Sequence, residues 1–273
     1  MVISLFITSP LKAYGYNSFK MDRQAYTDWA KRAGQALIPI LITLTCAVAA
    51  PAPLVVAVDT GTEMPMAGFV DGQLSEGFHK ELGEALASKL GREASFLLLP
   101  RKRIAMALDA GQADLICLYL PPWLPGNFQW TQGFFPVAEV VVTDTSVPQP
   151  HTLRDLSGQQ IATVLGYYYP EFDAALGQGF KRDDGYSSSG NLRKLAAGRL
   201  HHVITQQNTL DYYIKVGEKL SLYPPLVVKH YKAQCAVSPK GHVSIFEVNK
   251  AIDQIVRDRS VSKIISNYQS RLR

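Results

Sequence analysis

Aromatic side chains gather in two segments that the residue pattern places in loops. One is the stretch LGYYYPEFD, residues 165–173, in which three tyrosines and a proline follow an apolar run at Ile161–Val164. The other is the segment 119–136, which is rich in Pro, Gly, Trp and Phe. Tyrosine and tryptophan rings offer flat apolar area with a polar edge, which suits a planar ring, a sugar face or a cationic head group. The aromatic candidates for ligand binding are Tyr119, Trp123, Trp130, Tyr167 and Tyr168.

Packing is the alternative role for some aromatic side chains. Trp130 is equally well suited to anchor its own loop in a small apolar core. We expect Tyr169 and Phe172 to pack on the body of the protein. Pro170 fits the first turn of a helix, where its missing N–H is not needed, and such a helix start offers free N–H groups beside the tyrosines.

Charged candidates lie in other expected loops and helix starts. The run PRKR, residues 100–103, opens an expected helix, and Arg103 is the residue that we expect to face a ligand. Arginine is suited to bidentate recognition of anions but is also a common surface residue, and we expect Arg101 and Lys102 to be solvated. Glu63, in a loop after the first expected strand, is a candidate for binding a cation or an amine, and an ordinary loop carboxylate is the alternative.

Signatures of catalysis are missing from the sequence. It contains no G-x-S-x-G elbow, no phosphate-binding glycine loop and no pair of residues at the spacing of a metal site. His201 and His202 are adjacent, so their side chains point to different sides. Glu63 or His230 would be the acid of an enzymatic alternative, but nothing in the sequence marks either as activated. We therefore expect a binding protein that is not an enzyme and acts without a cofactor or metal.

The first 49 residues have the order of an export signal. Two basic residues, Lys31 and Arg32, precede an apolar run at Leu37–Leu44 and a small-residue cleavage site. We expect translation from Met21, cleavage after Ala49 and delivery to the periplasm. An uncleaved membrane anchor is the alternative, although prolines after the run interrupt a span that needs about 20 apolar residues.

Export changes how the charge of the chain is interpreted. The whole chain has 28 basic and 23 acidic residues. Residues 1–49 contain five of the basic and two of the acidic side chains, which leaves 23 against 21. An excess of two positive charges is no argument for a nucleic-acid partner.

Two cysteines follow the expected signal, Cys117 and Cys235, both in apolar, strand-like surroundings. An oxidising compartment permits a bridge between them. Two buried free thiols are the alternative that we favour, because free cysteine is among the most buried residue types.

Apolar periodicity predicts alternating strands and helices after residue 53. Strands are expected at Leu54–Asp59, Ser95–Leu99, Asp114–Leu118, Ala138–Thr143, Gln160–Val164, Val203–Thr205 and Gln234–Val237. Helices are expected at Gly77–Leu90, from Pro100, from about Tyr168, and at Asn191–Ala197, Leu210–Val216, Ile245–Val256 and Val261–Tyr268. The β-α-β-α-β order at the start indicates a parallel, layered α/β sheet.

A second α/β series begins after Pro148 and Pro150, which predicts two lobes. We expect lobe 1 to comprise residues 50–143 and 238–273, and lobe 2 to comprise residues 144–237. The chain then crosses between the lobes twice, and two crossings form a hinge. Ligands of such sheets bind outside the carboxyl ends of the strands, and a cleft between domains is a preferred pocket.

Six segments occur in an order typical of one protein family. They are Gly77-Phe78, ALDAGQADLI (107–116), FQWTQGFFP (128–136), LRDLSGQQIATVLG (153–166), AAGRLHHVITQ (196–206) and CAVSPKG (235–241). In order and spacing they resemble the extracytoplasmic solute-binding proteins of amino-acid ABC transporters, family 3. The resemblance implies a type II periplasmic-binding-protein fold that closes like a flytrap on a small solute and presents it to a membrane permease. We expect the protein to act as a monomer.

Three positions depart from that family's pattern. The segment YLPPWLPGN, residues 119–127, lacks the arginine that grips an α-carboxylate in family members. Tyr167 follows Gly166 where the family has Ser or Thr, and Gln206 stands where an aspartate usually pairs with the ligand's ammonium group. We therefore expect Gln206 to contact a small polar solute that is not an ordinary α-amino acid in the usual pose. A sensory module of the same fold that signals to a receptor is the alternative, and a periplasmic dehydratase or hydrolase is less favoured.

Overall fold

The computed structural model describes residues 51–269. The expected export signal, residues 1–49, lies outside the described residues, and the described residues all belong to one compact unit. Within the described part of the chain, no helix is long and apolar enough to cross a membrane.

Two groups of parallel strands are connected by two long antiparallel strands. The first strand group contains β4 (Ala94–Leu99), β1 (Leu54–Asp59) and β5 (Leu115–Tyr119). The second strand group contains β10 (His202–Gln206), β8 (Gln160–Val164) and β9 (Lys181–Gly185). The linking strands are β11 (Leu226–Val237) and β7 (Phe135–Thr143), which give the order β4-β1-β5-β11-β7-β10-β8-β9. A short strand, β6 (Gln129–Trp130), pairs with β11, and β2 (Gly68–Val70) forms a separate hairpin with β3 (Gln73–Glu76).

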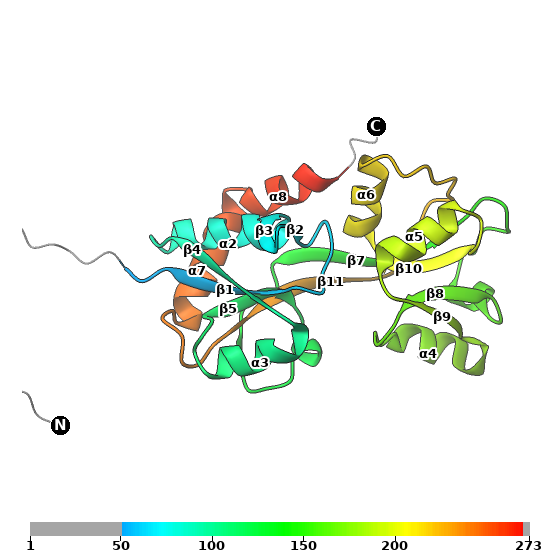
Figure 1. The fold of residues 1–273 in the computed structure, drawn as a ribbon. Helices are drawn as coiled ribbons and strands as arrows, with labels where there is room; N and C mark the ends of the chain where they lie inside the picture. The colour runs from blue at the N-terminus through cyan, green and yellow to red at the C-terminus, as the bar shows by residue number, and fades with distance from the viewer. Residues whose placement is uncertain (1–50, 270–273) are drawn as a thin grey trace, which may run out of the picture. The chain divides into compact units, whose positions relative to one another are not determined.

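Helices cover both faces of each strand group (Figure 1). The first group packs against α2 (Phe78–Lys89), α7 (Ile245–Arg257) and α8 (Ser260–Tyr268) on one face and against α3 (Arg101–Asp109) on the other. The second group packs against α5 (Ser188–Ala196) and α6 (Gln207–Lys215) on one face and against α4 (Pro170–Leu176) on the other. Each amphipathic helix thus buries its apolar side on a sheet, the layered arrangement that the strand–helix order predicts.

The apolar cores of the two groups change over inside the linking strands. On β7, Val137 belongs to the core of the first group and Val140 to that of the second. On β11, Ala233 packs in the first core and Val228 against the second. The linking strands are therefore structural parts of both groups.

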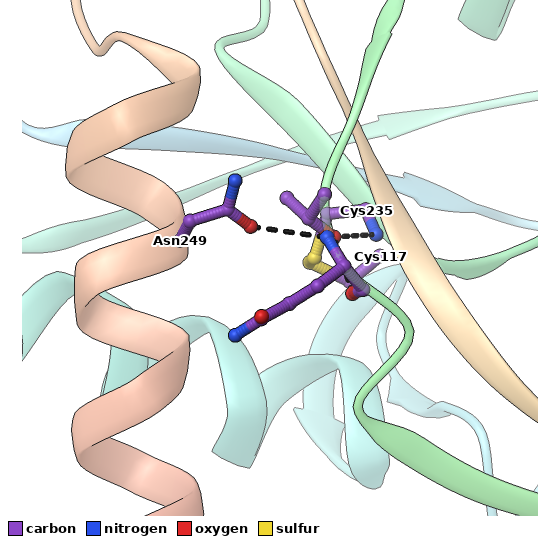
Figure 2. The surroundings of a disulfide bond; sticks show 5 residues. Cys117, Cys235 and Asn249 are labelled. Carbon is purple, nitrogen blue, oxygen red and sulfur yellow. Dashed lines mark hydrogen bonds between the residues drawn. A yellow bond between two sulfur atoms is a disulfide. The ribbon is translucent and has the colours of Figure 1, made fainter.

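A disulfide joins Cys117 of β5 to Cys235 of β11 (Figure 2). The prediction of two free thiols, which we favoured from the sequence, is wrong. The physical reason is register, since these two residues lie directly opposite each other on adjacent antiparallel strands. Next to the bridge, the N–H of Cys235 donates to Thr131 at 2.9 Å and the N–H of Gln132 donates to Asn249 of α7 at 3.0 Å (Figure 2).

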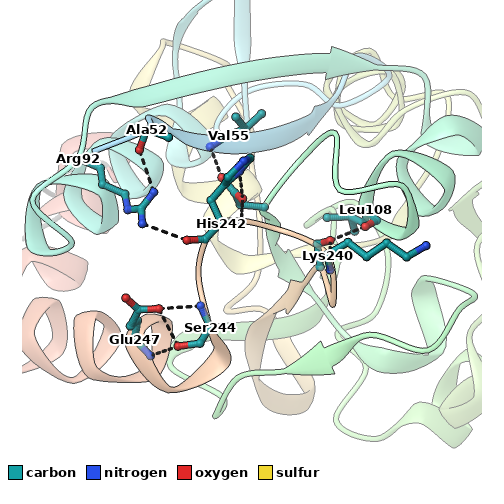
Figure 3. A network of polar contacts seen from close by, with 10 residues as sticks. Ala52, Val55, Arg92, Leu108, Lys240, His242, Ser244 and Glu247 are labelled. Carbon is teal, nitrogen blue, oxygen red and sulfur yellow. Dashed lines mark hydrogen bonds and ion pairs between the residues drawn. The ribbon is translucent and has the colours of Figure 1, made fainter. Parts of the chain in front are cut away.

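A polar network holds the returning chain after β11 against the first strand group (Figure 3). The carboxylate of Asp114 is 1% exposed and accepts the N–H groups of Val55 at 2.8 Å and His242 at 2.6 Å. The guanidinium of Arg92 donates to the carbonyl oxygens of Ala52 at 2.9 Å and His242 at 3.0 Å. The buried carboxylate is thereby satisfied by backbone donors and fixes the start of α7.

Candidate ligand-binding site

Side chains cluster where the strands of the first group end. Asp59 is the last residue of β1 and Tyr119 is the last residue of β5. Arg101 places its Nη1 atom 3.8 Å from Asp59 Oδ2 and its guanidinium 5.4 Å from the centre of the Tyr119 ring. Trp123 packs edge-on against Tyr119, with ring centroids 6.4 Å apart. Burial raises the pKa of Tyr119 far above its usual value, so its hydroxyl stays protonated next to Asp59.

Arg101, not Arg103, faces this cluster. We expected Arg101 to be solvated, but its half-exposed side chain contacts Asp59 and Tyr119. Arg103 is exposed and makes no side-chain hydrogen bond or ion pair within residues 51–269. Successive residues of an α-helix are rotated by about 100°, so a residue two places further points to the other side.

Glu63 connects the two strand groups. It lies in the loop after β1 and accepts hydrogen bonds from the backbone N–H of Ser189 at 3.0 Å and from its hydroxyl at 2.5 Å. Ser189 is buried in the first turn of α5, which Ser187 caps. The carboxylate therefore lies at the positive end of a helix dipole, and both of its oxygens have protein donors.

Trp130 lies on β6 and packs against the apolar cluster that also contains Tyr119. Its neighbour in the sheet is Ala236 of β11, and its half-buried ring packs against the apolar cluster beneath α3. This is the position that the packing alternative requires for Trp130.

The three tyrosines before α4 differ in exposure. Tyr169 is 4% exposed and its hydroxyl accepts the N–H of Val164 at 2.9 Å, while Phe172 is fully buried, so the packing role expected for both is confirmed. Tyr168 is 78% exposed.

Tyr167 faces the cluster of the first strand group from the second. Although 53% of its surface is exposed, the surrounding protein desolvates its hydroxyl and raises its pKa. The positive charge of Arg101 opposes this rise, and the negative charges of Asp59 and Glu63 add to it. The charge of an ionised Tyr167 also contributes to the raised pKa of Tyr119, so the two hydroxyls lie within electrostatic range of each other.

Polar side chains form a row across three neighbouring strands. Gln206, at the end of β10, lies opposite Glu139 of β7, and Glu139 lies opposite Lys229 of β11. Cross-strand partners share one face of a sheet, and these three residues are named the cross-strand row here. Lys229 forms a 2.6 Å ion pair with Glu171 of α4, and the amide of Gln206 donates to the hydroxyl of Tyr231 at 3.2 Å.

Acceptors outnumber donors around the cross-strand row. Within residues 51–269, no donor reaches the buried Oε1 of Glu139, Oε2 of Glu171 or Oε1 of Gln206. Burial raises the pKa of Glu139, and the charge of Lys229 opposes that rise. Burial is the largest single influence on Glu171 and raises its pKa, but the hydrogen bond from Lys229, a backbone hydrogen bond and the charge of Lys229 together outweigh it, so the pKa is lowered.

Tyr231 connects the cross-strand row to the aromatic cluster. Its ring packs edge-on against Trp123 with centroids 5.9 Å apart. Burial raises its pKa, with further contributions from Glu139 and Tyr167. The site therefore contains Tyr119, Trp123, Tyr167 and Gln206 from the predicted set.

Sequence reasoning missed several residues of this site, namely Asp59, Arg101, Glu139, Glu171, Lys229 and Tyr231. A period of two along β11 puts Lys229 and Tyr231 on one face, which is a signal present in the sequence. The residues that Lys229 and Tyr231 contact on other strands depend on strand register, which the sequence does not reveal.

A pocket of about 440 Å³ lies beside the linking strands, between residues 136–138, residues 230–232 and the facing ends of α6 and α8. None of the eight predicted residues lines it, and Tyr231 is the residue that it shares with the site. In the part of the chain that the structure describes, no group of three or more His, Cys, Asp or Glu side chains could hold a metal ion.

Comparison with known proteins identifies relatives that are similar in sequence and solved structures that are similar in fold. No family model matches the chain. It is 24% identical over 217 residues to the probable amino-acid-binding protein YxeM of Bacillus subtilis (strain 168), which covers 77% of this chain and 81% of that protein. It is 22% identical over 203 residues to the arginine-binding extracellular protein ArtP of the same organism, covering 72% of this chain and 78% of that protein.

Solved structures agree on the fold. An ancestral arginine-binding protein bound to arginine matches with a TM-score of 0.61 at 20% identity, over 79% of this chain and 97% of that one. The ancestral amino acid-binding protein AncCDT-1, a precursor of cyclohexadienyl dehydratase, matches with a TM-score of 0.62 at 18% identity, over 80% and 95% of the two chains. The chain has the mixed α/β, type II periplasmic-binding-protein fold of these amino-acid-binding proteins.

Proposed function

We propose that this chain is an exported member of the solute-binding family that serves amino-acid ABC transporters. The observation that carries the proposal is the position of Tyr119 and Trp123 at the strand ends of one group, opposite Tyr167 from the other. The names of both relatives, which describe amino-acid binding, support it.

Closure of the two lobes around the solute is the proposed mechanism. The lobe that contains the first strand group turns against the lobe that contains the second, about the linking strands. The contact between Glu63 and Ser189 joins the two sides and is a contact that closure makes. The closed monomer presents its solute to a permease at the membrane.

The periplasm is the proposed location of the mature protein. The disulfide between Cys117 and Cys235 supports this, because such bridges persist in oxidising compartments. Cleavage after Ala49 would release the compact unit.

The solute is proposed not to be an ordinary α-amino acid in the usual pose. Arg101, the arginine that faces the site, is already paired with Asp59. The amide of Gln206 is bonded to Tyr231, so it does not replace the aspartate that grips an ammonium group in family members. A receptor in place of the permease would use the same site.

Catalysis is not part of the proposal. Glu63, an acid candidate, has both oxygens engaged by Ser189, and His230 is exposed on β11. AncCDT-1 is itself described as an amino acid-binding protein.

A thermal-shift screen of the purified protein tests the proposal. The library contains amino acids, organic acids, sugars, polyamines and aromatic amines. A solute at about 100 times its Kd stabilises the folded state by about 2.7 kcal/mol, which raises Tm measurably. Tyr167→Ala should abolish the shift, and Phe246→Ala, which removes a 74% exposed ring on α7, should leave it unchanged. The proposal would be contradicted if no solute in the library raised Tm, or if the solute raised Tm equally in both variants.

A further inference from the structure

The cross-strand row and its neighbour Glu171 together present three buried acceptor oxygens that no donor reaches within residues 51–269. They belong to Glu139, Glu171 and Gln206. Buried polar groups in proteins are almost always hydrogen-bonded, and a buried acceptor that lacks a donor is destabilising. A proton on Glu139 would supply one donor for three acceptors. A primary ammonium group carries three N–H donors, which equals the number of acceptors that lack one.

The cations near the row are already paired. Lys229 is bound to Glu171 at 2.6 Å, and Arg101 lies 3.8 Å from Asp59. Glu139 has no cationic partner of its own among the described residues, because the nearest lysine is held by Glu171. The site therefore has a carboxylate to offer to a solute, whereas an anionic solute would have to break an existing ion pair.

Aromatic rings stand beside this carboxylate. Tyr231 already receives a cation, since Lys229 Nζ lies 5.9 Å from its ring centre. Trp123 packs on Tyr231, and Tyr167 is electrostatically coupled to it. Aromatic faces attract cations, most strongly when water is excluded.

The acceptor oxygens can turn towards a solute. Glu139 and Glu171 are half-buried as side chains, so one face of each remains near the surface. The terminal torsion of glutamate is broad and roughly two-fold, so a half-turn of the carboxylate exchanges its buried oxygen with the other one.

We propose that the site recognises an organic primary amine through Glu139 and its neighbours Gln206 and Glu171, with the rings of Tyr231, Tyr167 and Trp123 around the ammonium group. The inference rests on the proposed function and names the chemical class of the solute. An α-carboxylate on that solute is not required.

Isothermal titration of the purified wild-type protein with matched probes tests this inference. Putrescine and tyramine are each compared with an uncharged alcohol of the same skeleton and with the N-trimethylated derivative. A carboxylate analogue of tyramine is the anionic probe. We expect at least one primary amine to bind, and its alcohol and carboxylate analogues not to bind. The trimethylated derivative should bind at least about tenfold more weakly, because it keeps the charge but has no N–H donor.

Variants assign the effect to Glu139. Glu139→Gln should weaken amine binding at least about tenfold while an unchanged circular dichroism spectrum reports that it is folded. Glu84→Gln, which removes an exposed carboxylate paired with Lys80, is the matched control and should bind as the wild type does.

Three results would overturn the inference. Amine binding that Glu139→Gln leaves unchanged removes the role of Glu139. A neutral or anionic solute that binds in a Tyr167-dependent manner, while every amine fails, refutes the amine class and leaves the proposed function intact. Failure of every solute in the screen overturns both.

Discussion

Replacement of both Cys117 and Cys235 by alanine should lower the free energy of unfolding substantially. The bridge closes a loop with a sequence separation of 118 residues. Chain entropy for a loop of that length gives about 5 kcal/mol at 25 °C, and removal of native disulfides typically costs about 2–5 kcal/mol. Domains of this size have about 5–15 kcal/mol of stability in total, so the loss is a large fraction. We expect a decrease of about 2–5 kcal/mol.

Urea unfolding followed by circular dichroism measures this loss. Three samples are compared: the oxidised wild type, the wild type with reductant, and the Cys117→Ala/Cys235→Ala variant. Reductant should destabilise the wild type and leave the variant unchanged, which controls for effects of the reductant itself. A wild type whose midpoint and slope do not respond to reductant would refute the reasoning and restore the free thiols that the sequence favoured.

The stability of the first strand group offers two further predictions. Burial lowers the pKa of His79 to about 4. As the pH falls, His79 therefore binds a proton in the unfolded chain before it does so in the folded protein. The free energy of unfolding should fall by up to about 3 kcal/mol between pH 6.5 and pH 4. In urea unfolding at several pH values, His79→Leu should make the free energy of unfolding less dependent on pH. Gly77→Ala should cost about 2–5 kcal/mol in the same assay, because φ is 107° and a Cβ would lie 2.7 Å from the Cα of Ala67. Gly72→Ala, with φ at 74° and open space, should cost only about 1 kcal/mol; equal costs at both glycines would contradict the steric argument.

Strands with clear apolar patterns could be predicted from the sequence almost to the residue. The expected bounds of Leu54–Asp59 and Gln160–Val164 are those of β1 and β8. The parallel pairing of β1 with β4 and β5 is confirmed. Buried strands carry this signal because both of their faces are covered by helices.

Exposed strands could not be predicted in the same way. β9 has the sequence KRDDG, in which four residues are charged, because it is an edge strand that pairs with β8 alone. The hairpin of β2 and β3 is mostly exposed. β11 was expected only from Gln234 to Val237, whereas it begins at Leu226, since its first half pairs with β7 and carries polar residues that face the site.

The candidate site shows the same division between local and non-local information. Tyr167 and Tyr119 could be found because loops and strand ends can be located from local sequence. Arg101 was missed although it lies three residues before the buried Ile104 of α3, because its partners Asp59 and Tyr119 come from other strands. Glu139 and Tyr231 were missed because each acquires its neighbours from other strands.

Binding of one small solute per chain is the central claim, and calorimetric titration of the wild type with the best solute from the thermal screen tests it most directly. We predict a saturable heat that corresponds to one solute per chain. Replacement of Tyr167 by alanine should lower the affinity for that solute at least about tenfold. Titrations without saturable heat, or a Tyr167→Ala variant that binds as tightly as the wild type, would contradict the account.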